Sequence, residues 1–64
     1  MNTYNIRTDA DSGTVLARDL NVAIRVYFGL ASLRALKQRF ARLDGGWCRI
    51  DCDGETLVEI GINY

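Results

Sequence analysis

The fold class is decided by residues 47–64, WCRIDCDGETLVEIGINY. Two runs of alternating apolar and polar residues, Trp47 to Cys52 and Thr56 to Tyr64, flank Asp53-Gly54, a dipeptide that is typical of β-hairpin turns. A strict two-residue loop would mix apolar and charged side chains on both faces of the hairpin, whereas a three-residue connection through Glu55 separates them. We therefore expect a longer or bulged turn.

The three-residue connection also predicts which side chains meet. Across the hairpin it pairs Cys52 with Thr56, Ile50 with Val58, Cys48 with Ile60 and Arg49 with Glu59. The buried face of the hairpin then consists of the apolar residues Cys48, Ile50, Val58, Ile60 and Ile62. Such a face needs a layer of helices to cover it.

Upstream of the hairpin, the spacing of the apolar residues changes to that of helices. One apolar stripe contains Leu33, Leu36, Phe40 and Leu43, with Ser32 as a candidate N-cap and Gly45-Gly46 as the candidate end. An earlier helix begins at a cap formed by Asp19 or Asn21 and reaches Gly29. Its buried stripe is Leu20, Ala23, Ile24, Tyr27 and Phe28.

The first residues complete the order of elements. Residues 4–8 alternate apolar and polar, which predicts a short strand, and residues 9–13 are turn formers. The predicted fold is α+β with the order β-α-α-β-β, in which two helices pack on one face of a small, mainly antiparallel sheet. Residues 1–64 are expected to form a single compact domain, with Tyr4 and Tyr27 in its core. The pattern leaves open whether the first strand pairs with the second or the third.

The residue types limit the chemistry. The chain of 64 residues has no histidine, which is the commonest general base and a usual zinc ligand. Cys48 and Cys52 lie about 13 Å apart along one strand, too far for a disulfide, and are interpreted as core thiols. The run Asp51, Asp53 and Glu55 supplies only part of a calcium loop. We therefore expect no enzyme activity, no cofactor and no metal site.

The sequence also indicates where the protein acts. The N-terminus has neither the basic nor the apolar region of a signal peptide. The most apolar stretch, Val22 to Leu36, contains Arg25 and Arg34 and is too short to cross a bilayer of about 30 Å. A cytoplasmic protein without a membrane partner is expected.

The charge is unevenly distributed along a chain whose net charge is zero. The second predicted helix carries the cations Arg34, Lys37, Arg39 and Arg42, and the hairpin region carries the acids Asp44, Asp51, Asp53, Glu55 and Glu59. Each set can be a solvated face. Alternatively, the acids meet cations that otherwise grip nucleic-acid phosphates, or the basic helix itself contacts phosphates. A zero net charge favours the first of these two functional interpretations.

Trp47 belongs to the same candidate surface as the acids. Its position, on the hairpin face opposite the cysteines, is compatible with an exposed aromatic anchor for a protein partner. It is equally compatible with a residue that covers the edge of the core.

In its length, its Met-Asn-Thr-Tyr opening, its order of elements and its polarised charge, the chain resembles the small anti-CRISPR proteins of phages and mobile elements. The resemblance covers the whole chain and rests on no specific motif. It implies a non-enzymatic inhibitor that binds a CRISPR-Cas effector complex, often of type I, in the host bacterial cell and blocks target DNA binding or nuclease recruitment. The expected partner is a Cas effector subunit with a basic surface. The alternative is a small nucleic-acid-binding or regulatory protein that uses the basic second helix.

Overall fold

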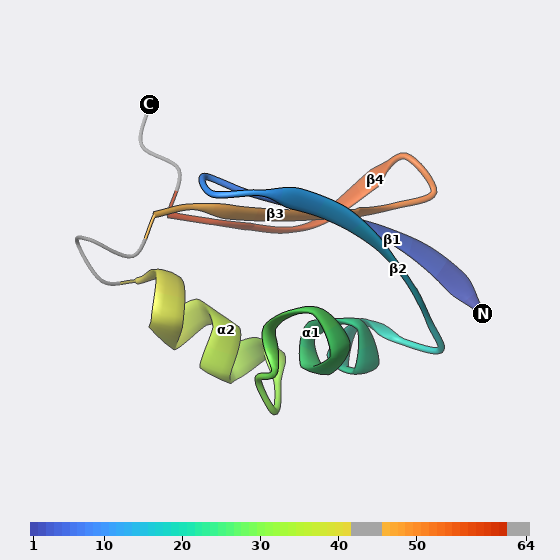
Figure 1. Cartoon of the computed structure of the whole chain (residues 1–64), viewed down its shortest axis with the longest axis horizontal. Coiled ribbons are helices and arrows are strands. Elements are labelled where there is room, and N and C mark those ends of the chain that lie inside the picture. The colour runs from blue at the N-terminus through green and yellow to red at the C-terminus, as the bar shows by residue number, and fades with distance from the viewer. Residues whose placement is uncertain (42–45, 62–64) are drawn as a thin grey trace.

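A computed structural model describes residues 1–41 and 46–61 of the chain. Its elements are β1 (Asn2–Thr8), β2 (Ser12–Ala17), α1 (Leu20–Phe28), α2 (Leu33–Phe40), β3 (Cys48–Cys52) and β4 (Glu55–Ile60). The four strands form one sheet in the order β2-β1-β3-β4, and every neighbouring pair is antiparallel. Both helices pack on one face of this sheet, and the other face is uncovered by the described residues (Figure 1).

The predicted α+β class and the two helices on one face are confirmed, but the sheet has one strand more than expected. The additional strand, β2, contains Ser12 and Gly13, for which the residue types predict a turn. The actual turn is shorter, because the Thr8 backbone N–H donates to the Asp11 carbonyl oxygen at 2.8 Å and closes it. β1 therefore lies in the middle of the sheet, between β2 and β3.

The predicted hairpin is formed by β3 and β4, and most of its register is confirmed. Cys48 is opposite Ile60, Arg49 opposite Glu59 and Ile50 opposite Val58. Nearer the turn the prediction is wrong: Cys52 pairs with Glu55, and Asp51 pairs with Thr56.

The turn itself explains this difference. Asp53 and Gly54 have φ values of 53° and 79°, which is the backbone of a two-residue type I′ turn whose twist matches the strands. The register shifts between Ile50 and Asp51, so that Leu57 is an extra residue in β4. The expected bulge therefore exists, but it lies within the strand, and the turn is not lengthened.

Both predicted helix starts are confirmed. The side chain of Asp19 accepts a hydrogen bond from the Val22 backbone N–H, and that of Ser32 accepts one from the Ala35 backbone N–H. Gly29 ends α1 in the left-handed conformation, with φ 72°.

α2, however, ends at Phe40 and not at Gly45-Gly46. Gly45 lies outside the described residues, but Gly46 has φ 76°, and a Cβ added there would collide with the Asp9 carboxylate. Gly46 therefore serves a close approach of chain segments at the start of β3 instead of a helix cap.

The core lies between the helices and the sheet. Its buried residues are Tyr4, Ile6, Val15, Ala17, Ala23, Ile24, Leu36, Phe40, Cys48, Ile50 and Val58. Tyr27 is only partly buried, because its hydroxyl reaches a surface carboxylate, and the predicted core residues Leu43 and Ile62 lie outside the described residues. Within the described ranges no helix is long and apolar enough to cross a membrane.

Candidate protein-binding surfaces

The acids predicted to form a hairpin surface are distributed over different parts of β3 and β4. Asp53 and Glu55 are exposed at the turn between the two strands. Glu59 is exposed further along β4, opposite Arg49. Asp44 lies outside the described residues.

Asp51 is held within a polar network on the uncovered face of the sheet. Its Oδ1 atom lies 3.1 Å from Arg49 Nε and accepts a hydrogen bond of 2.7 Å from the Thr56 hydroxyl. Arg49 Nη2 also donates to Thr56 Oγ1 at 3.0 Å. The Thr56 hydrogen bond lowers the pKa of Asp51, with a further contribution from Arg49 and against the opposing effect of burial. Asp51 is thus neutralised within the chain and is poorly suited to a partner's cation.

Trp47 lies at the opposite end of the hairpin from Asp53. It is partly buried just before β3 begins, and its backbone N–H donates to Asp9 Oδ1 over 3.4 Å. The structure therefore does not bring Trp47 together with the acids of the turn.

The basic residues of α2 have two different environments. Arg34 and Lys37 are exposed on the helix. The guanidinium carbon of Arg39 lies 5.6 Å from the ring centroid of Phe40 and 6.0 Å from that of Phe28, within the range of a cation–π interaction. Arg42 lies outside the described residues.

The charge asymmetry of the sequence corresponds to a difference in charge between the helical layer and the sheet layer of the structure. Residues 18–41, which include both helices, carry five cations and one acid: Arg18, Arg25, Arg34, Lys37 and Arg39 against Asp19. In the described ranges 1–17 and 46–61, the strands and their turns carry six acids and two cations: Asp9, Asp11, Asp51, Asp53, Glu55 and Glu59 against Arg7 and Arg49. The helical layer is basic and the sheet layer is acidic.

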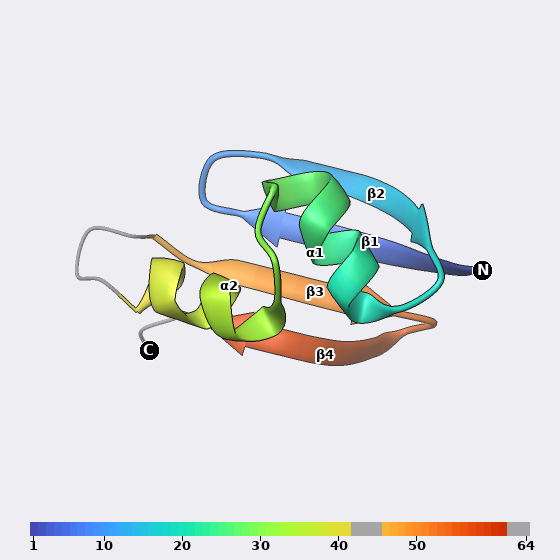
Figure 2. The same cartoon turned by 90° about the horizontal axis from the view of Figure 1, so that it is seen from below.

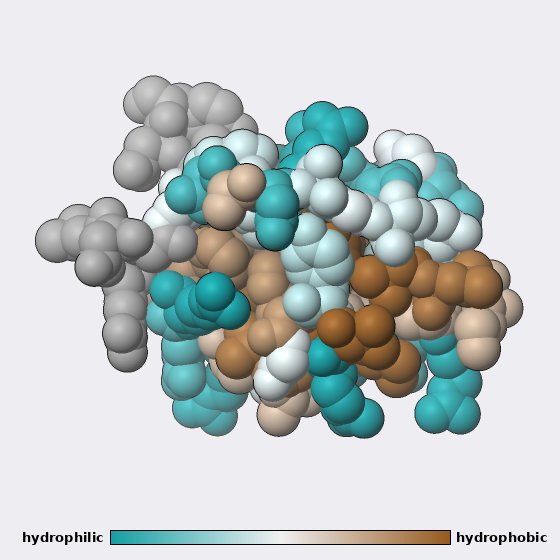
Figure 3. Space-filling view, in the orientation of Figure 1, coloured by the Kyte–Doolittle hydropathy of each residue, from teal (hydrophilic) through white to brown (hydrophobic). Residues whose placement is uncertain are grey.

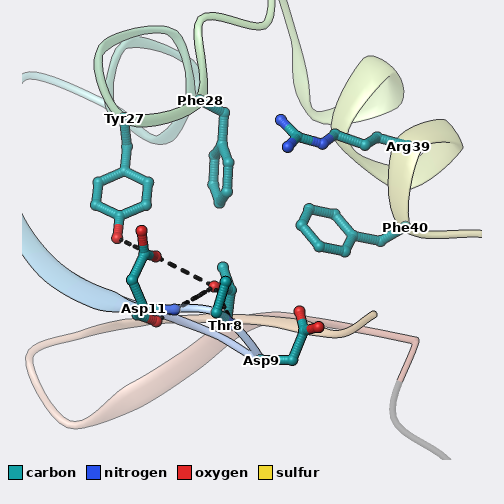
Figure 4. A pocket seen from close by; sticks show the side chains of 8 residues that line it. Thr8, Asp9, Asp11, Tyr27, Phe28, Arg39 and Phe40 are labelled. Atoms are coloured by element: carbon teal, nitrogen blue, oxygen red, sulfur yellow. Dashed lines mark hydrogen bonds between the residues drawn. The ribbon is translucent and has the colours of Figure 1, made fainter. Parts of the chain in front are cut away.

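A cleft of about 450 Å³ lies where the β1–β2 turn approaches the last turns of both helices (Figure 4). It is lined by Thr8, Asp9, Ala10, Asp11, Tyr27, Phe28, Arg39 and Phe40. The carboxylates belong to its strand side, whereas Arg39 and the aromatic rings come from the helices. In the sequence, Asp9 and Asp11 are recognisable only as turn formers. The first helical residue that lines the cleft, Tyr27, is 16 residues after Asp11, and this separation in the sequence concealed the cleft.

Hydrogen bonds fix the Asp11 side of this cleft. The Tyr27 hydroxyl donates to Asp11 Oδ1 at 2.8 Å, and the Thr8 hydroxyl lies 3.2 Å from the same oxygen. The hydrogen bond to Asp11 raises the pKa of Tyr27, and burial and the negative charge of Asp11 act in the same direction. Tyr27 therefore remains a neutral donor that orients the carboxylate.

The aromatic side of the cleft is a continuous row of rings. Tyr27 and Phe28 meet edge to face with centroids 4.9 Å apart, and Phe28 and Phe40 do so at 5.8 Å. No lysine or arginine of the described residues pairs with Asp9 or Asp11. The cleft thus offers two carboxylates and the partly exposed rings of Tyr27 and Phe28 to an external cation, whereas Phe40 is buried behind them.

The thiols lie in surroundings that disfavour reaction. Cys48 is fully buried, and burial raises the pKa of its thiol to about 11, against a smaller opposing effect of the Arg39 charge. Cys52 is free and partly buried, and burial together with the acids Asp53 and Glu55 raises its pKa. Among the residues in the described ranges, no group of three potential metal ligands converges.

Comparison with known proteins provides no relative from which a site could be transferred. No protein-family model, no curated protein and no solved structure matches the chain.

Proposed function

We propose that the chain is a non-enzymatic inhibitor that binds a basic surface of a nucleic-acid-handling complex and receives an arginine or lysine side chain of that partner in the cleft. The observation that carries this proposal is the cleft itself. It combines Asp9 and Asp11, which have no cationic partner among the described residues, with the partly exposed ring of Phe28. This set of groups suits the planar, positively charged head of an arginine particularly well.

The same rings already hold a cation. Arg39 covers Phe40 and Phe28 from the helix side, which supports the view that these faces attract positive charge. A partner's cation would enter on the strand side, where the two carboxylates lie. The exposed Asp53 and Glu55 at the other end of the sheet extend the acidic surface towards the same partner.

The resemblance to anti-CRISPR proteins suggests the target. In this proposal the basic surface belongs to a subunit of a CRISPR-Cas effector, of type I in the first instance, and its cations otherwise hold target DNA. Occupying them blocks DNA binding or nuclease recruitment in the cytoplasm of the host bacterium. No catalytic step and no cofactor are involved.

The test measures binding of the full chain to a purified type I effector complex and the capture of target DNA by that complex. Asp9→Asn together with Asp11→Asn removes two charges from the cleft while retaining an acceptor oxygen at each position. The control, Asp53→Asn together with Glu55→Gln, removes two charges at the opposite turn. We expect affinity to fall about tenfold or more for the cleft pair and at most about threefold for the control.

Two results would contradict this assignment. A greater loss for the turn variant than for the cleft variant would move the contact to the hairpin acids. Unchanged DNA capture at saturating wild-type protein would eliminate the type I effector as the target.

The second candidate function is nucleic-acid binding by the helical layer. It is favoured by the excess of cations over residues 18–41 and by the exposure of Arg34 and Lys37. It predicts a mobility shift of labelled duplex DNA that weakens with salt and weakens further in Arg34→Ala with Lys37→Ala. Absence of any shift at low salt with micromolar protein would eliminate it.

A further inference from the structure

The two outer strands of the sheet differ in how they are protected against pairing with another strand. β2 and β4 are at the two outer positions (Figure 2). β4 carries Glu55 and Glu59 and is interrupted by the bulge at Leu57. Charges and bulges on an edge strand are devices that keep a further strand from adding to a sheet.

β2 has neither device. Its sequence, SGTVLA, contains no charged residue and no proline, and its register with β1 continues without a shift from Asn2 opposite Ala17 to Arg7 opposite Ser12. No strand of the described residues pairs with its outer side. Backbone N–H and C=O groups therefore point outwards along a regular, uncharged strand, which is a template for another strand.

Apolar side chains are exposed on the elements next to this edge. The side chain of Leu16 on β2 is 64% exposed, and that of Val26 on α1, the helix that packs over β2, is 65% exposed. Figure 3 looks on to the side of the molecule where β2 is nearest to the viewer and shows hydrophobic surface gathered over α1 and the end of β2. An unpaired edge and exposed apolar side chains thus occur on the same side of the molecule.

We propose that β2 pairs antiparallel with β2 of a second copy of this chain, so that two four-stranded sheets become one of eight strands. A two-fold axis through Val15 pairs Val15 with itself and Thr14 with Leu16 of the other copy. Since opposite residues of an antiparallel pair share a face, both helical layers then lie on the same side of the sheet. This assembly requires neither the cleft nor its ligand.

The absence of charge on β2 favours a second copy of β2 as the strand that pairs with it. Within the paired strands no like charges are opposed, because β2 itself carries no charge. A nucleic acid would find no cation on β2 to neutralise its phosphates. A charged peptide would find no opposite charge on the strand, and a second β2 offers the same neutral, β-branched pattern that β1 already accepts on the other side.

The experiment is sedimentation equilibrium of the full chain over concentrations up to about 1 mM, a range that detects even weak association. The wild-type mass should rise with concentration from 7.2 kDa towards twice that value. Leu16→Lys places a charge on the edge and should remain monomeric throughout. The matched control is Thr3→Lys, because Thr3 lies directly opposite Leu16 on the uncovered face but belongs to the inner strand β1; it should dimerise like the wild type.

Each outcome decides the proposal. A wild-type protein that is monomeric at every concentration overturns it, and so does a Leu16→Lys protein that dimerises as well as Thr3→Lys. Far-UV circular dichroism verifies that both variants are folded. Should Leu16→Lys fail to fold, Thr14→Lys puts the charge on the same strand, opposite Asn5. Hydrogen exchange provides an independent readout: β2 amides should become more protected as concentration rises, and protection confined to β4 would refute the pairing.

Discussion

Replacing Ile50 by alanine should remove most of the stability of the fold. Ile50 is completely buried in β3, directly opposite Ile6 of β1 and Val58 of β4, which are themselves buried. It therefore lies at the centre of the layer between the sheet and the helices. Small domains of this size have only a few kcal/mol of net stability, so that a single large cavity is decisive.

The expected magnitude follows from the atoms removed. Ile50→Val deletes one methyl-sized group and should cost about 1 kcal/mol in the free energy of unfolding. Ile50→Ala deletes three, which corresponds to about 2.4 kcal/mol of transfer free energy, and the unfilled cavity raises the total to about 3–4 kcal/mol. Leu57→Ala is the control, because Leu57 is the 41% exposed residue of the β4 bulge and should cost less than about 1 kcal/mol.

Urea unfolding at pH 7 and 25 °C, followed by circular dichroism, measures these differences. The midpoints should fall in the order wild type, Leu57→Ala or Ile50→Val, and then Ile50→Ala, with unchanged dependence on urea. Equal losses for Ile50→Ala and Leu57→Ala would refute the assignment of Ile50 to the core face and with it the register of β3.

Three further predictions concern the thiols, the caps and the Asp51 network. In native protein at pH 7.5, a thiol reagent should modify Cys52 well before Cys48, because a pKa of about 11 instead of 9.0 leaves Cys48 with about one hundredth of the thiolate of an ordinary cysteine; equal labelling rates in mass spectrometry would contradict this. Asp19→Ala and Ser32→Ala should each lower the free energy of unfolding by about 1 kcal/mol, because each loses an N-cap hydrogen bond. The control is Ser12→Ala, which should change the free energy of unfolding little because Ser12 is exposed in β2. Equal urea midpoints for the cap variants and this control would speak against the caps. Since folding lowers the pKa of Asp51, its contribution to stability is present above the ordinary pKa of 3.8 and is lost as the pH falls through the lowered value. Between pH 7 and pH 3, the free energy of unfolding should therefore fall less for Asp51→Asn than for the wild type. An identical fall for both proteins would exclude the Asp51 network as its cause.

Much of the fold could be predicted because it depends on local patterns. The caps Asp19 and Ser32 and the glycine after α1 act within one helical turn, so that their positions in the sequence identify the helix boundaries. The alternation from Cys48 to Ile50 and from Val58 to Ile60 was sufficient to predict their pairing.

β2 was not predicted because its signal is weak in isolation. Ser12 and Gly13 have turn propensity, and only the pairing of Thr14 to Ala17 with β1 makes the segment a strand. The bulge at Leu57 was misplaced for a related reason: the sequence requires one extra residue, but the backbone preference of Asp53-Gly54 for a tight turn decides where it goes.

The candidate sites also divide into features that the sequence predicts and features that depend on tertiary packing. The sequence by itself determined that the chain has two helices and a hairpin, two cysteines that cannot bond to each other, no histidine and opposite charges in different segments, because residue types and short-range spacing are properties of the chain alone. Only the tertiary structure decided that Asp51 pairs with Arg49 and accepts a hydrogen bond from Thr56, and that Trp47 lies apart from the acids of the turn. It also decided that Asp9 and Asp11 share a cleft with Phe28 and Phe40. The physical reason is that a binding surface consists of groups from distant segments, and their mutual distances are set by the packing of helices on a sheet.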